Sequence, residues 1–103
     1  SLEIRKRVQR VRDIQLNRFS GREGIFCNAQ MESRDVNLYC RLDAKSSDLL
    51  KMAMSKLGLS ARAYDKILKL SRTIADLDGK DHIRPEHVSE AIQYRSLDRH
   101  LWI

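Results

Sequence analysis

The sequence has 103 residues, a hydrophobic fraction of 42%, a charged fraction of 33% and a formal net charge of +6 at pH 7. This length suits one small domain with one core, and the composition is typical of a soluble globular protein. No apolar run is long enough to span a membrane and nothing resembles a signal peptide, which argues against a membrane protein. Because the first residue is not methionine, we expect the chain to be part of a longer protein.

The N-terminal segment carries most of the positive charge, and it has a narrow apolar stripe that predicts a helix over residues 3–18. The stripe consists of Ile4, Val8, Val11, Ile14 or Gln15, and Phe19. Such a basic segment is typical of a surface that contacts nucleic acid or an acidic partner, but it is equally consistent with a solvated helix face. Arg5, Arg7 and Arg12 are the candidate nucleic-acid contacts.

Two shorter helices are predicted in the middle of the chain, over residues 33–40 and 44–57. Ser33 and Asp43 are the expected N-caps, because their side chains can accept a backbone N–H of the first turn. Gly58 is expected to end the second helix in the left-handed conformation. The connection to the next helix is then so short that we expect the two helices to be close neighbours.

The most regular pattern predicts a helix over residues 60–77, with Ser60 as its N-cap. Its apolar stripe is wide enough for a central position in a bundle and consists of Ala63, Ile67, Leu70, Ile74 and Leu77. The opposite face is charged and consists of Arg62, Asp65, Lys66, Lys69, Arg72 and Asp76. Arg62 lies in the first turn, where free N–H groups and the helix dipole attract anions. From spacing alone, it can either bind a phosphate or cover apolar surface with its stem.

A last helix is predicted over residues 85–95, because Pro85 suits the first helical position and pushes Arg84 into an extended conformation. Residues 96–103 are apolar enough that we expect them to pack on the domain. The predicted fold is an all-α bundle of four or five helices. The expected core consists of Leu50, Ala53, Leu57, Ile67, Leu70, Ile74, Val88 and Ile92.

The sequence lacks the motifs of a self-sufficient enzyme. There is no glycine-rich phosphate loop and no strand that ends in an acidic pair for Mg²⁺. No Ser/His/Asp or Cys/His arrangement typical of nucleophilic catalysis stands out. Cys27 and Cys40 are expected to be buried free thiols in a reducing cytoplasm. The histidines do not share a helical face with suitable partners, so no metal site is expected. We therefore expect no catalytic activity from this chain alone.

Two stretches carry a resemblance to a known family. "LSARAYDKILKLSRTIADLDG" followed by "IRPEHVSEAIQYRSLDR" resembles the C-terminal domain of the magnesium-chelatase-like AAA+ ATPases, the YifB/ComM group. The upstream "VQRVRDIQLNRF" and "CNAQM" fit the same family, so the resemblance covers nearly the whole chain. A weaker likeness extends to the lids of the magnesium chelatase ATPase subunit and of MoxR-type ATPases. Ser71 departs from the alanine expected there.

The resemblance implies that the whole chain is the helical C-terminal lid of a larger ATPase. The nucleotide-binding core of that ATPase is not part of this sequence. The serine–x–arginine at Ser60 then matches the sensor-2 motif, which makes Arg62 the residue that reaches the γ-phosphate of ATP. ATP and Mg²⁺ are implied for the full-length protein and no cofactor for this chain. The implied partners are its own core domain and neighbouring subunits of a hexameric, cytoplasmic ring. Arg72 and Lys69 are candidate residues for a domain or subunit interface, but the position of Arg72 is equally consistent with a solvated surface role. The lid would couple nucleotide state to ring motion.

Two alternatives from other functional classes stay open. One is a stand-alone basic helical domain that binds DNA through its first helix. The other is a helical protein-interaction module. The sequence lacks the interleaved aromatic residues of single-strand binders and has no convincing helix-turn-helix signature. DNA can also be a partner of the full ATPase, since helicase-like members of the family act on it.

Overall fold

The computed structural model describes the backbone of residues 2–101 and the side chains of residues 2–94. Over this range the fold is all-α, as predicted. The elements in chain order are α1 (Leu2–Arg18), the 3-10 turn η1 (Asn28–Gln30), α2 (Ser33–Tyr39), α3 (Ala44–Leu57), α4 (Ala61–Leu77) and α5 (Pro85–Leu101). The predicted bounds agree to about one residue, except that α5 continues beyond residue 95. The expected packing of residues 96–103 lies outside the described side chains.

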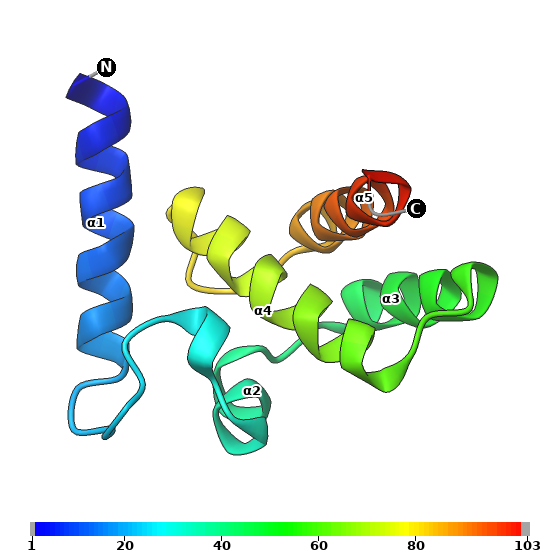
Figure 1. Cartoon of the computed structure of the whole chain (residues 1–103), viewed down its shortest axis with the longest axis horizontal. Helices are drawn as coiled ribbons and strands as arrows, with labels where there is room; N and C mark the ends of the chain where they lie inside the picture. Colours follow the sequence, from blue (N-terminus) through cyan, green and yellow to red (C-terminus); the bar gives the residue numbers. More distant parts are fainter. Residues whose placement is uncertain (1, 102–103) are drawn as a thin grey trace.

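Helix α4 occupies the centre of the domain (Figure 1), as its wide apolar face predicts. It packs against α5, η1, α1 and α2, whereas α3 packs mainly against α5. The expectation that α3 and α4 are close neighbours is therefore wrong, because the two helices diverge after their short turn. The segments before α3 and α5 meet in a parallel bridge between Leu42 and Ile83, where the sequence predicts an extended piece.

The predicted ends of α3 and α4 are confirmed. Asp43 Oδ1 accepts the Ser46 backbone N–H at 2.7 Å, and Ser60 Oγ accepts that of Ala63 at 3.2 Å. Gly58 has a φ of 61°, in the left-handed region that favours glycine.

The predicted cap of α2 is wrong by one residue. Glu32, not Ser33, is the N-cap. The Asp35 carboxylate accepts the Glu32 backbone N–H at 3.0 Å, so the third residue of the helix fixes its start. Arg22 donates to the same Asp35 carboxylate at 2.9 Å, which ties the loop before η1 to α2.

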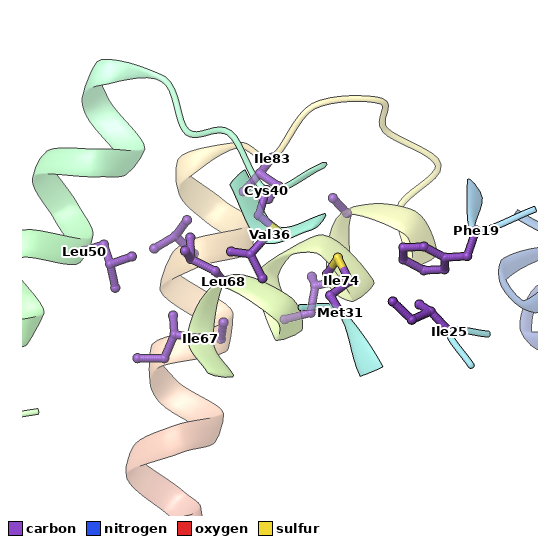
Figure 2. Packing of buried hydrophobic residues seen from close by; sticks show 13 residues of the cluster. Phe19, Ile25, Met31, Val36, Cys40, Leu50, Ile67, Leu68, Ile74 and Ile83 are labelled. Atoms are coloured by element: carbon purple, nitrogen blue, oxygen red, sulfur yellow. The ribbon is translucent and has the colours of Figure 1, made fainter. Parts of the chain in front are cut away.

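The core lies around α4 and is confirmed for four of the predicted residues, Leu50, Ile67, Ile74 and Val88. Figure 2 shows the cluster extending from Leu50 of α3 past Ile67 and Leu68 to Phe19 and Ile25. The predicted core residues Ala53, Leu70 and Ile92 are half-buried. Leu57 is 41% exposed, so its assignment to the core is wrong. It is the last residue of α3.

We expect Ile74→Ala to lower the free energy of unfolding by about 2–5 kcal/mol, the usual range for large-to-small changes in a core. Ile74 belongs to the buried cluster with an exposed fraction of 8%. Chemical denaturation followed by circular dichroism measures the change. A loss below about 0.5 kcal/mol, the usual size for a surface substitution, would show that this face of α4 is not part of the stabilising core.

The buried residues of helix α1 lie in its C-terminal half. Val11, Gln15 and the following Phe19 are buried, whereas Ile4 is 64% and Val8 is 43% exposed. The predicted apolar stripe therefore enters the core only from Val11 onward. None of the helices within the described residues is both long and apolar enough to cross a membrane.

Both cysteines are free thiols, as expected. Cys40 is buried, but Cys27 is only half-buried. Burial raises the pKa of Cys40 to about 11, despite the opposing positive charges of Arg72 and Arg18. Cys40 is therefore a protonated, unreactive thiol at neutral pH.

Candidate functional site

Arg62 lies in the first turn of α4 and is exposed. Ser60 caps this end of the helix by accepting the Ala63 backbone N–H. Within the described part of the chain, the Arg62 guanidinium has no hydrogen-bond or ion-pair partner. The structure thus confirms the expected exposure of Arg62 at the start of the central helix.

This arrangement suits an anion supplied from outside the domain. The first turn of a helix leaves backbone N–H groups without intrahelical acceptors, and the helix dipole adds a partial positive charge. A guanidinium at the same place offers a planar fork of donors that matches phosphate oxygens. Among the described residues, no group of three or more potential metal ligands lies together.

Arg72 is buried, so a solvated surface role for its side chain is wrong, and its role as an interface residue stays a prediction. Its exposed fraction is 4%. Its Nη1 donates to the Asp81 carbonyl at 2.8 Å and its Nη2 to the Lys80 carbonyl at 2.7 Å. Its Nε donates to Asp76 at 3.1 Å. Arg72 therefore holds the loop between α4 and α5 from inside the domain.

Asp76, which the sequence pattern places on the charged face of α4, is buried at the centre of this polar cluster. Its carboxylate accepts two hydrogen bonds from Arg18, at 2.7 and 2.8 Å, and one from Asn28 Nδ2 at 2.9 Å. The Asn28 backbone N–H donates in turn to Gln15 Oε1 at 2.9 Å. One carboxylate thus joins α1, η1 and α4, and through Arg72 it also reaches the loop before α5.

The charges of this cluster determine the protonation of Asp76. Burial by itself would raise the pKa of Asp76, but hydrogen bonds from Arg18 and Asn28 and the charges of Arg18 and Arg72 outweigh it. The net result is a pKa below the usual value of 3.8. Asp76 is therefore ionised at neutral pH, where it compensates one of the two positive charges of the buried Arg72 and the partly buried Arg18.

The basic residues of the N-terminal segment do not form one patch. Arg5 and Arg12 are exposed and share a face of α1, since they are seven residues apart. Arg7 is also exposed, but it points to another side and its Nε donates to the Leu77 carbonyl at 3.0 Å. Arg18 and Arg22 are engaged within the domain by Asp76 and Asp35. Lys69, the second candidate interface residue, is half-buried.

His87 is a buried polar residue for which the sequence pattern predicts no role. Its exposed fraction is 2%. The Arg84 backbone N–H donates to His87 Nδ1 at 2.9 Å, so Nε2 carries the proton that is donated to Asp78 Oδ2, also at 2.9 Å. This hydrogen bond lowers the pKa of Asp78. His87 fixes the start of α5 in the way that a glutamate does in a capping box.

Comparison with known proteins agrees with this architecture. Residues 1–95 match the family described as magnesium chelatase, subunit ChlI C-terminal. The chain belongs to this family, and it has the helical fold described above.

Its relatives include two curated bacterial proteins. The chain is 44% identical over 99 residues to competence protein ComM of Haemophilus influenzae, a match that covers 96% of this chain and 18% of the relative. It is 36% identical over 99 residues to the uncharacterized protein YifB of Escherichia coli, covering 96% of this chain and 19% of that protein. The chain therefore spans less than a fifth of the length of these relatives.

Proposed function

We propose that this domain is the C-terminal lid of a magnesium-chelatase-related AAA+ ATPase and that Arg62 is its sensor-2 arginine. The observation that carries the proposal is the exposed Arg62 without an internal partner among the described residues, in the capped first turn of the central helix. Membership of the magnesium chelatase C-terminal family supports the assignment to such an ATPase.

The contribution of Arg62 follows from the charge that phosphoryl transfer develops. The transition state carries negative charge on the γ-phosphate oxygens, and fixed cations stabilise it. Arg62 would provide one such cation when the lid closes over ATP. ATP and Mg²⁺ would be held chiefly by the core domain, and this chain offers one arginine and a helix N-terminus toward the phosphate.

The internal contacts of the lid explain how nucleotide state could reach the rest of a ring. Asp76 joins α4 to α1 and η1, and Arg72 joins α4 to the following loop. A force on Arg62 would therefore move the lid as one body. Neighbouring subunits are proposed to sense that motion. For a full ATPase that acts on DNA, Arg5 and Arg12 are the proposed phosphate contacts.

The isolated chain should have no useful affinity for ATP. One charged hydrogen bond contributes about 1.5–3 kcal/mol. Even a millimolar dissociation constant needs about 4 kcal/mol. Isothermal titration calorimetry of this chain with Mg·ATP should give no measurable binding. A dissociation constant in the micromolar range would contradict a lid that supplies only one arginine.

The proposal is tested by measuring lid closure in the full-length ATPase. Spin labels on the core and on α5 should report a shorter distance with a non-hydrolysable ATP analogue than without nucleotide. Arg62→Ala should abolish this change, whereas Arg41→Ala, which removes another exposed arginine of the domain, should leave it intact. Equal closure in the wild type and in Arg62→Ala would contradict the assignment.

A further inference from the structure

His87 joins the end of α4 to the start of α5 through both nitrogens of its ring. The Arg84 backbone N–H donates to Nδ1, and Nε2 donates to the Asp78 carboxylate, both at 2.9 Å. Asp78 is the residue that follows α4, and Arg84 precedes Pro85, the first residue of α5. The side chain of His87 is 2% exposed, and the proposed function makes no use of it.

The hydrogen bond from Arg84 requires a neutral ring. A neutral imidazole has one donor and one acceptor nitrogen, whereas the protonated ring has two donors and no acceptor. Protonation would therefore set the Nδ1 proton against the Arg84 N–H and break that hydrogen bond. The hydrogen bond from Nε2 to Asp78 would remain and would join opposite charges. A change in the charge of His87 thus acts on the start of α5 and leaves its contact with Asp78 in place.

Arg84 is also the residue whose carbonyl begins α5. This carbonyl accepts the backbone N–H groups of His87 and Val88 at 3.0 and 3.2 Å. The bond from the Arg84 N–H to His87 is one half of a capping box, in which the third residue of a helix fixes the residue before the helix. Loss of this bond would remove one of the contacts that hold Arg84 in place. Because α5 packs against both α4 and α3, its first turn is a joint of the bundle.

Charges of both signs surround His87. The other ionisable side chains of the groove between α1, α4 and α5, which His87 also lines, are Arg7 of α1, Lys66 of α4, Asp78 after α4, and Glu86, Glu90 and Tyr94 of α5. No described residue of α3 lines this groove. In the loop, Lys80 and Arg84 act by charge on Asp78, but the hydrogen bond from His87 is the largest cause of its lowered pKa. Asp78 therefore stays ionised between about pH 5 and 8, the range in which a histidine ordinarily changes its charge.

We propose that His87 is a pH-sensitive cap of α5: the neutral ring holds the start of the helix, and the protonated ring releases the Arg84 N–H and loosens the first turn. The cap is intact at neutral pH and is lost as the pH falls. Because the bond to Asp78 persists, the junction between α4 and α5 loosens without detaching His87 from the end of α4. The proposal does not depend on the role of Arg62.

Nuclear magnetic resonance of the ¹⁵N-labelled chain tests the proposal. At neutral pH the ring nitrogens of His87 should show the tautomer with the proton on Nε2. As the ring becomes protonated between about pH 8 and 5, the exchange protection of the Arg84 and Val88 amides, corrected for the intrinsic pH dependence of exchange, should fall about tenfold. Constant protection while the ring becomes protonated would overturn the proposal. So would a ring that stays neutral over this whole range in the folded chain.

Two substitutions separate His87 from its neighbours. His87→Gln offers an oxygen that can accept the Arg84 N–H, as glutamine does at the third helical position of a capping box, but it does not titrate. This variant should keep the Arg84 amide protected, with a change below about twofold between about pH 8 and 5. His82→Gln removes an exposed histidine of the same loop and should retain the response of the wild type. A wild-type response in His87→Gln, or its loss in His82→Gln, would assign the titration to another group and overturn the proposal.

Discussion

Arg62→Ala in the full-length ATPase is expected to lower ATP turnover by about 100-fold or more, the usual loss when one donor to transition-state charge is removed. The fold should be unaffected, because Arg62 is exposed and has no partner within the described residues. The loss should fall on kcat more than on KM, since the charge that Arg62 would stabilise is greatest in the transition state. Steady-state hydrolysis assays combined with thermal unfolding measure both expectations.

The geometry of the side chain gives this prediction a second test. Arg62→Lys should restore turnover only in part, since lysine offers a point charge without a planar fork. Arg41→Ala is the matched control, because it removes an exposed arginine away from the start of α4 and should retain wild-type turnover. Wild-type turnover in a well-folded Arg62→Ala enzyme would refute the sensor-2 assignment.

Asp76→Asn is expected to be the most destabilising single change among the polar residues, with a loss of about 3–5 kcal/mol. The amide has nearly the same shape as the carboxylate, but it leaves the buried charge of Arg72 and the partly buried charge of Arg18 without a counter-ion. Urea denaturation of this chain measures the loss. Asp65→Asn is the control, because it removes an exposed carboxylate from the same helix and should cost less than about 0.5 kcal/mol.

The pH dependence should separate the charge of Asp76 from its shape. Because the folded pKa of Asp76 lies below its ordinary value of 3.8, ionised Asp76 stabilises the fold above that value. This contribution is lost as the pH falls through the lower, folded pKa. The stability difference between wild type and Asp76→Asn should therefore be constant near neutrality and shrink in acid. A difference that stays constant down to pH 2–3 would mean that packing, not charge, causes the loss.

The helices could be predicted because their signals are local. Ser60, Asp43 and Gly58 act through atoms within a few residues along the chain, so the sequence pattern contains the whole interaction. Arg62 was predictable for the same reason: its exposure follows from its place in the first turn of α4, and the proposed role came from a family resemblance.

The buried polar cluster around Asp76 could not be predicted in this way. Asp76 and Arg72 are spaced like a surface ion pair, and nothing local distinguishes them from Asp65 and Lys69. Their burial depends on Arg18, 58 residues away from Asp76 in the sequence. A partial signal was present, because a central helix covered by several others must bury some of its polar face. Such buried charges require partners.

The loop between α4 and α5 should not tolerate a change in its length, because contacts hold it at several points. Its carbonyls at Lys80 and Asp81 are held by Arg72, its Ile83 pairs with Leu42, and His87 bonds to Asp78 at its beginning. Inserting or deleting a single residue there would misplace several of these contacts at once. Engineered tags, sensor insertions and circular permutation should therefore avoid this loop and use the exposed connection near Gly24 instead.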